Sequence, residues 1–154
     1  MAWLEPLRGL FGRRGAGPAG RVKVIEVTGR ADVVVKANTP ANTPIPVSIT
    51  YDPQRPAVTT ITPAVNETWE IADLFVTAAP AVDGVVQFVK NDYEIVQRTN
   101  PISTYRADWA QRDRIRPVTV GPLERLNLFY FNASTPTADT TVTFFLKIRI
   151  YRRE

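Results

Sequence analysis

The 154-residue sequence contains neither cysteine nor histidine. Without cysteine there is no disulfide, no thiolate nucleophile and no soft sulfur ligand for a metal. Histidine is the side chain whose ordinary pKa suits proton transfer near neutral pH, and it is the commonest metal ligand. The sequence therefore predicts a protein that is not an enzyme, with no catalytic, cofactor-binding or metal-binding residue.

Long hydrophobic runs are also missing. No segment approaches the roughly 20 consecutive apolar residues that span a bilayer. At the N-terminus the apolar positions are interrupted by Glu5, Pro6 and Arg8, so a signal peptide is not expected. We therefore interpret the two glycosylation-like triplets, 66–68 and 132–134, as chance matches.

The net charge of +4 is confined to the N-terminus. Residues 1–23 hold five basic side chains and one acidic side chain, whereas the remaining residues hold 14 of each sign. A protein that binds nucleic acid along a whole face is expected to spread its basic residues over that face. A neutral body with a basic arm instead predicts a local tether.

The arm, residues 1–20, combines an apolar stripe with a flexible linker. Its large apolar side chains recur at the spacing of one helix face, and Pro6 falls in the first turn, where proline is tolerated. The Gly-rich segment 12–20 then has nothing to bury. The sequence predicts an amphipathic helical arm whose candidate contact residues are Trp3, Leu4, Leu7, Arg8, Leu10, Phe11, Arg13 and Arg14.

Three partners fit this arm. The apolar stripe fits a groove on a neighbouring subunit, or a membrane surface, where aromatic residues, leucine and arginine are typical. The arginines alone fit nucleic-acid phosphates. Nucleic acid is the least favoured partner because it leaves the apolar stripe without a contact.

From residue 21 onward, short β-rich runs alternate with Pro, Gly, Asn and Asp. Nine or ten strands at this spacing predict an all-β fold, an antiparallel β-sandwich of jelly-roll type, over residues 21–154. The thirteen prolines suit edge strands and connections. The expected strands are 22–28, 32–37, 45–51, 57–62, 67–77, 85–90, 93–97, 115–120, 125–132 and 140–151.

The segment 98–114 is long for a sandwich connection, so we expect either a functional loop or a short helix over 107–114. It combines aromatic residues with arginine, a pairing that is enriched at protein interfaces and suits stacking on sugar rings. The same aromatic side chains also suit the covering of one end of the core. The candidate interface or ligand residues are Tyr105, Arg106, Trp109, Arg112 and Arg114.

The acidic residues offer one enzymatic alternative. Glu67 and Glu70 flank Trp69, and Asp108 and Asp113 lie in the long segment. A glycosidase needs two carboxyl groups about 5–10 Å apart across a groove. Each acid has a basic neighbour, so ion pairing is the simpler expectation, and catalysis ranks third among the hypotheses.

A proline-rich β-sandwich behind a basic arm and a Gly-rich hinge resembles the coat and decoration proteins of icosahedral viruses. Residues 1–20 match the arm, 67–90 match consecutive sandwich strands, and 121–151 match the terminal hairpin. The resemblance implies a virion protein that forms the capsid shell or decorates it. Its implied partners are further copies of the chain and other virion proteins, and the arm would reach neighbouring subunits or an underlying membrane.

A different class of function follows from the segment 98–114. Its aromatic and arginine residues fit a carbohydrate- or receptor-binding β-sandwich. The two hypotheses differ in the part of the chain that meets the partner, because assembly depends on the arm and ligand binding depends on the segment.

Overall fold

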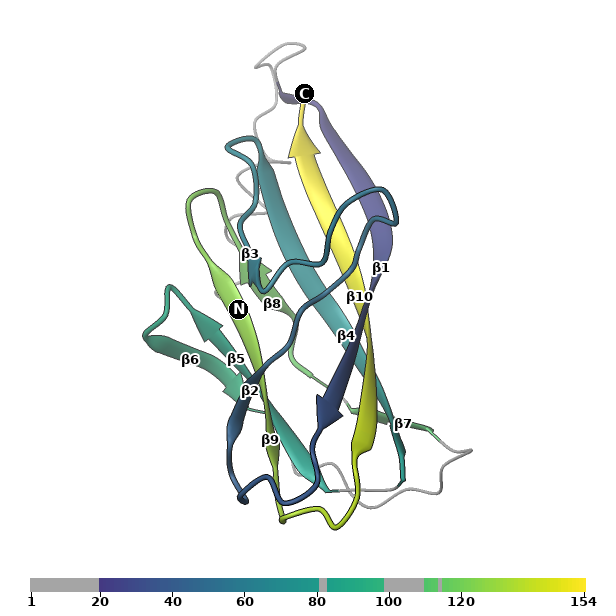
Figure 1. Ribbon diagram of the computed structural model, residues 1–154. Coiled ribbons are helices and arrows are strands. Elements are labelled where there is room, and N and C mark those ends of the chain that lie inside the picture. The colour runs from purple at the N-terminus through teal and green to yellow at the C-terminus, as the bar shows by residue number, and fades with distance from the viewer. Residues whose placement is uncertain (1–19, 81–82, 99–109, 114) are drawn as a thin grey trace.

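The computed structural model describes residues 20–80, 83–98, 110–113 and 115–154 (Figure 1). Within these residues the chain forms ten β-strands and no α-helix. No helix in this described part is long and apolar enough to cross a bilayer. The strands are β1 (Val22–Val35), β2 (Pro44–Pro46), β3 (Thr60–Ile61), β4 (Glu67–Ala79), β5 (Gly84–Lys90), β6 (Glu94–Arg98), β7 (Ala110–Asp113), β8 (Val118–Val120), β9 (Leu126–Asn132) and β10 (Thr140–Arg153).

The strands form two antiparallel sheets. Sheet A has the order β1-β10-β4-β7. The strand β8 also pairs with β4, nearer to the start of β4 than β7 does. Sheet B has the order β2-β9-β5-β6, and β3 pairs with β9. Because β2 and β3 both pair with β9, and β7 and β8 both pair with β4, each of these two pairs counts as one strand of its sheet. The resulting eight strands have the order of a jelly roll. The predicted fold class, an antiparallel β-sandwich of jelly-roll type, is confirmed.

The core lies between the sheets because each long strand alternates apolar and polar side chains. In β10 the predicted inward face is confirmed: Phe144, Leu146 and Ile148 are fully buried. The ring of Phe144 lies edge-on to that of Tyr130 in β9, with 5.8 Å between the centroids. This aromatic contact joins the two sheets at the centre of the sandwich.

One side of the sandwich is closed by the segment 47–50, which crosses from sheet B to sheet A. The amide of Val47 donates to the carbonyl of Leu128 (3.0 Å), and Arg30 and Thr50 exchange two backbone hydrogen bonds of 2.8 Å. The predicted strand 45–51 is therefore wrong in its extent. Pro44 and Pro46 have no amide hydrogen to donate to a ladder, and after Val47 the chain leaves sheet B.

The strand β1 is continuous, although two separate strands, 22–28 and 32–37, were expected. Gly29 does not break it. Gly29 faces the core, and a Cβ atom there would lie 2.8 Å from Cγ2 of Ile49. The missing side chain therefore makes room for the crossing segment rather than marking a turn.

The helix expected over 107–114 is also wrong where the structure describes it. Ala110–Asp113 forms β7, which pairs with Leu74–Thr77 at the free side of β4. Pairing satisfies backbone groups that an unpaired edge would leave without partners. This tertiary contact outweighs the weak local helix propensity.

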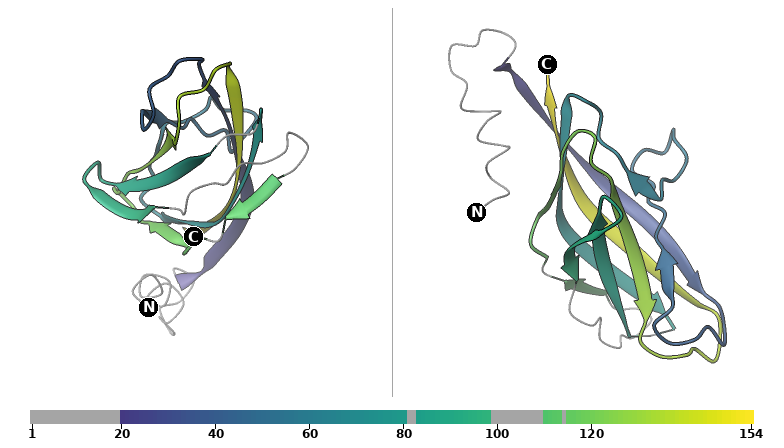
Figure 2. Two further views of the ribbon diagram at one scale, coloured as in Figure 1. Left: turned by 90° about the horizontal axis from the view of Figure 1, so that it is seen from below. Right: turned by 90° about the vertical axis from the view of Figure 1, so that its left-hand side faces the viewer.

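Sheet A extends beyond sheet B at the end where both termini leave the sandwich (Figure 2). Val22 pairs with Arg153, and the amide of Glu154 donates to the carbonyl of Arg21 (3.0 Å). The strands β4 and β9 start at this end, as the pairing of Glu67 with Arg152 and of Leu126 with Lys90 indicates. We call it the terminal end, and the turns 62–66, 91–93 and 121–124 lie there.

Candidate functional site

Most of the site residues predicted from the sequence lie outside the described residues. These are the arm residues Trp3, Leu4, Leu7, Arg8, Leu10, Phe11, Arg13 and Arg14, and the segment residues Tyr105, Arg106, Trp109 and Arg114. Arg112 lies in β7, where it pairs with Phe75. What the structure does place is the attachment of both segments: the arm joins at Gly20 on the terminal end, and the long segment runs from β6 to β7.

The terminal end carries five exposed large hydrophobic side chains, a group that we call the apolar terminal surface. Six large hydrophobic side chains are exposed among the described residues, and only Val34 lies elsewhere. Single exposed apolar residues are ordinary, whereas exposed apolar side chains that lie next to one another are typical of a contact surface. The members are Val24 (50% exposed), Val65 (82%), Tyr93 (87%), Ile95 (60%) and Leu123 (84%).

The turns that carry Tyr93 and Leu123 are fastened to each other. The amide of Asn91 donates to the carbonyl of Arg125 (2.7 Å), and the amide of Arg125 donates to Oδ1 of Asn91 (3.1 Å). The guanidinium of Arg125 also pairs with Asp92 at 2.9 Å. The β5–β6 turn and the turn that joins β8 of sheet A to β9 of sheet B therefore present their apolar side chains on one frame, which lowers the entropy cost of binding a partner.

Leu123 has an unusual backbone. Its φ of 65° lies in the left-handed region, which costs an L-residue with a bulky side chain about 1–2 kcal/mol. Asn91 and Asp92 also have positive φ, but short polar side chains tolerate it. An exposed leucine gains no core packing that would offset the strain, and strained residues cluster at functional sites.

The opposite end is built from polar turns. The side-chain amide of Asn132 donates to the carbonyls of Thr39 (3.3 Å), Pro40 (3.1 Å) and Ser134 (3.0 Å). The carboxylate of Asp139 accepts a hydrogen bond from the amide of Ala37 (2.9 Å), which holds the pKa of Asp139 below its ordinary value. The turns 36–43 and 133–139 are thus ordered by internal hydrogen bonds, in contrast to the apolar terminal surface.

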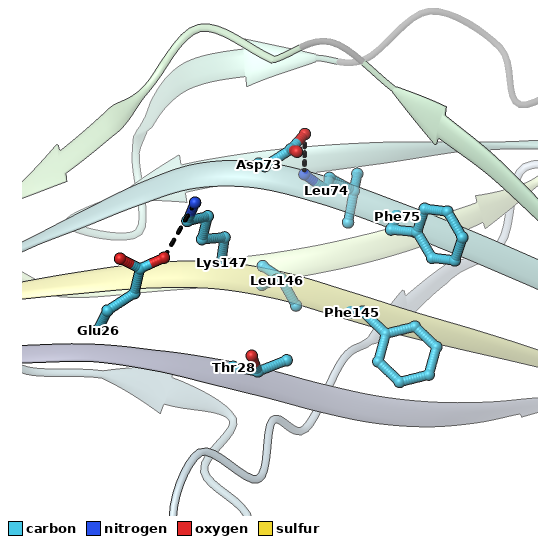
Figure 3. A pocket seen from close by; sticks show the side chains of 8 residues that line it. All are labelled: Glu26, Thr28, Asp73, Leu74, Phe75, Phe145, Leu146 and Lys147. Carbon is cyan, nitrogen blue, oxygen red and sulfur yellow. Dashed lines mark hydrogen bonds and ion pairs between the residues drawn. The ribbon is translucent and has the colours of Figure 1, made fainter.

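A second candidate surface is a shallow hollow of about 330 Å³ on the outer face of sheet A (Figure 3). One half is aromatic: the rings of Phe75 and Phe145 lie 6.0 Å apart, and the guanidinium of Arg30 lies 5.5 Å from the centroid of Phe145. We call it the outer hollow. It is lined by Glu26, Thr28, Asp73, Leu74, Phe75, Phe145, Leu146 and Lys147.

The other half of the outer hollow is charged. Lys147 pairs with Glu26 at 2.9 Å, and the hydrogen bond from Lys147 holds the pKa of Glu26 below its ordinary value. The carboxylate of Asp73 accepts a hydrogen bond from the amide of Leu74 (2.9 Å). Aromatic rings beside fixed carboxylates are typical of carbohydrate sites, because a sugar offers apolar ring faces and hydroxyl donors.

The carboxylates of Glu67 and Glu70 do not converge. They are three positions apart along β4, so they lie on opposite faces of sheet A, and each pairs with an arginine of β10. Glu67 accepts hydrogen bonds from Nη2 (2.7 Å) and Nε (2.9 Å) of Arg152, and Glu70 accepts one from Arg149 (3.0 Å). The arrangement is two separate ion pairs rather than a two-carboxylate site.

Glu67 couples the stability of the terminal end to pH. Burial acts to raise its pKa, but the hydrogen bonds from Arg152 and from the indole of Trp69 outweigh burial and lower the pKa below 4.5. A folded-state pKa below the unfolded-state value stabilises the fold above about pH 4.5, and this stabilisation is lost as the pH falls through the folded value.

We therefore expect Glu67→Gln to destabilise the protein at pH 7 by about 1–2 kcal/mol, because the guanidinium of Arg152 loses its anionic hydrogen-bond acceptor. The difference in melting temperature from the unsubstituted protein should shrink as the pH falls below about 4.5 and Glu67 becomes protonated. Thermal denaturation followed by circular dichroism at several pH values measures this. Glu94→Gln, on the exposed strand β6, is the control, and a Glu67→Gln effect that stays constant with pH would contradict the assignment.

Sequence reasoning did not single out Tyr93 or Leu123. Both turns had a visible signal, because Tyr93 follows Asn91-Asp92 and Leu123 follows Gly121-Pro122. A large apolar residue directly inside a turn is unusual, since turn positions favour Gly, Pro, Asn, Asp and Ser. That signal predicts that each side chain is exposed. It does not predict that the two turns contact each other, because this contact depends on the strand order.

Comparison with known proteins gives no family assignment. No protein-family model matches the chain, and no curated protein matches it. Among solved structures, the Eiger TNF structure from S. frugiperda is similar over 85% of this chain and 93% of that chain, at 11% sequence identity and a TM-score of 0.39.

Proposed function

We propose that this chain is a structural subunit of a virion, which builds the capsid shell or decorates its surface through contacts between subunits. Its partners are further copies of the chain and other virion proteins. Three features support the proposal: the jelly-roll body, the basic amphipathic arm ahead of it, and the apolar terminal surface.

Leu123 is the single observation that carries the proposal. It is 84% exposed and holds a positive φ, so it costs stability without contributing to the core of the isolated subunit. A partner that covers Leu123 and the neighbouring Tyr93 would offset that cost by burying apolar area. Aromatic residues at the centre of a contact commonly dominate its binding energy.

The arm and the apolar terminal surface act together because the arm joins the body at the end that carries this surface. Gly20 lies two residues before Val22, the first residue of β1, and β1 starts beside the end of β10. One subunit can therefore contact a neighbour with its turns while its arm reaches across the same neighbour. A membrane beneath the shell is the second surface that the arm fits, whereas nucleic acid is less favoured because the charge is confined to the arm.

The double variant Tyr93→Ser/Leu123→Asn tests the contact. We expect the apparent dissociation constant of the assembly to rise by at least about 30-fold, the effect of losing roughly 2 kcal/mol of hot-spot contact. The monomer should unfold at the same or a slightly higher temperature, because asparagine tolerates the left-handed backbone at position 123. Light scattering coupled to gel filtration over a concentration series measures the first effect, and thermal denaturation measures the second.

Val34→Ser is the matched control, since Val34 is exposed but lies at the opposite end of β1. It should leave assembly unchanged. Assembly of the double variant at the same concentrations as the control would show that the terminal end is not the contact.

The outer hollow favours a second candidate, a carbohydrate- or receptor-binding module that uses the segment 98–114. The observation in its favour is that β7, which ends that segment, runs directly beside the aromatic half of the hollow through the pairing of Arg112 with Phe75. Glycan-array binding by the full chain and by Tyr105→Ala/Trp109→Ala separates the two functions. Glycan binding that the variant loses while it still assembles would favour the binding module.

A further inference from the structure

A second hollow, of about 460 Å³, lies on the inner face of sheet A at the terminal end. We call it the inner hollow. Its floor is apolar and comes from β1, β4 and β10: Ile25, Val27, Trp69 and Ile150. Residues 51–55, which follow the segment 47–50, and the turn before β4 form its rim, which includes Tyr51, Thr62 and the ion pair of Asp52 with Arg55.

The inner hollow exists because sheet A is longer than sheet B. Further along the same inward face of β1, Ala31, Val33 and Val35 are at most 5% exposed, whereas Ile25 and Val27 are only partly buried. At the terminal end, sheet B reaches only as far as the pair of Leu126 and Lys90. It therefore does not cover the first residues of β1 and the last residues of β10. The hydrophobic face of sheet A therefore continues past the layer that should bury it.

The walls of the hollow are fixed in place before any partner binds. The rings of Tyr51 and Trp69 pack edge to face, with 5.0 Å between the centroids. The indole of Trp69 donates to Glu67 (3.1 Å), which also accepts hydrogen bonds from Arg152. At the rim, Arg55 pairs with Asp52 at 3.5 Å. Since the charged lining groups are paired with one another, the floor left for a ligand is apolar, and it fits an apolar side chain rather than an ion.

We propose that the inner hollow receives the apolar stripe of the N-terminal arm from a second copy of the chain. The proposal rests on the proposed function and names the acceptor of the arm. Nineteen residues precede Gly20, and their stripe of Trp3, Leu4, Leu7, Leu10 and Phe11 needs a surface, because a helix of about a dozen residues is marginal alone in water. The hollow supplies an apolar surface at the end from which the arm leaves.

Reach and symmetry favour a neighbouring copy. The nine linker residues 12–20 span up to about 30 Å when extended, which is enough to cross a contact between two bodies. If two copies meet through their apolar terminal surfaces, the arm of each starts against the terminal end of the other. Two arms can then be exchanged reciprocally, as a twofold contact requires.

The absence of cysteine allows a clean crosslinking experiment. Two single variants, Leu7→Cys and Thr62→Cys, are mixed at the assembling concentration, oxidised, and examined on non-reducing gels with peptide mass spectrometry. We expect a disulfide between the two chains at a yield at least about tenfold above that of the control mixture, because docking raises the effective concentration of the thiols. The control pairs Leu7→Cys with Thr135→Cys, at the opposite end of the body.

Two outcomes overturn the proposal. A yield equal to the control shows that the inner hollow does not hold the arm. A disulfide that forms only within one chain, in the double variant Leu7→Cys/Thr62→Cys, shows that the arm occupies its own hollow.

Val27→Trp fills the inner hollow without touching the arm or the apolar terminal surface, and it provides a second test. With an unchanged melting temperature, it should raise the apparent dissociation constant by about tenfold or more. If Val27→Trp assembles normally although arm deletion abolishes assembly, the acceptor is wrong and the proposed function stands. If arm deletion leaves assembly intact, the role of the arm in the proposed function fails instead.

Discussion

We expect removal of residues 1–20 to leave a folded body that no longer assembles. The body should fold because its core is built from β1 onward, and the first core residue lies beyond the deleted segment. Assembly should stop because the deletion removes the whole apolar stripe together with Arg8, Arg13 and Arg14. Gel filtration with light scattering should give the monomer mass at every concentration, and the melting temperature should change by no more than a few degrees.

Two full-length variants separate the parts of the arm. Trp3→Ser/Leu7→Ser/Phe11→Ser removes the stripe and should behave like the deletion. Arg8→Gln/Arg13→Gln/Arg14→Gln removes the charge and should still assemble, because the stripe makes the contact. A truncated protein that assembles as well as the full chain would show that the arm has no part in assembly.

Gly84→Ala should be the most destabilising of the small substitutions. Gly84 lies at the start of β5, and a Cβ atom there would overlap the ring and hydroxyl of Tyr130. Tyr130 has little room to move, since it is 1% exposed and packs against Phe144. We expect a loss of about 3 kcal/mol, the upper part of the usual cost of overpacking, out of a total stability of about 5–15 kcal/mol.

The surroundings of Tyr130 support this expectation. Its hydroxyl donates to the carbonyl of Asp83 (3.4 Å), and burial, with the nearby Asp83 carboxylate, raises the pKa of Tyr130 to about 12. Guanidinium unfolding monitored by fluorescence measures the loss. Gln87→Ala, at an outward-facing position of the same strand, is the control and should cost less than about 0.5 kcal/mol. An equally small effect of Gly84→Ala would mean that the ring has free space beside it.

The long strands could be predicted from the sequence because they alternate over many residues. In β10 every second residue from Val142 to Ile150 points into the core, and buried and partly buried residues alternate in the same way in β9. The wrong predictions concern segments whose conformation depends on tertiary contacts. Gly29 suggests a break in β1 unless Ile49 is known to fill its space, and Ala110–Asp113 becomes a strand only because β4 offers an unpaired edge.

The candidate surfaces were less predictable. The arm and its charge are visible in the sequence, since they depend on composition and spacing alone. The apolar terminal surface joins three turns that are far apart in the chain, so it requires the strand order of both sheets. The inner hollow requires the relative lengths of sheets A and B, which no single segment encodes.

The most direct test of the central claim is the solution mass of the full chain, measured by sedimentation velocity over a micromolar concentration series. The claim that this chain is an assembly subunit predicts species heavier than the 17.2 kDa monomer, whose population grows with concentration and falls in Tyr93→Ser/Leu123→Asn. A single 17.2 kDa species at every concentration would contradict it.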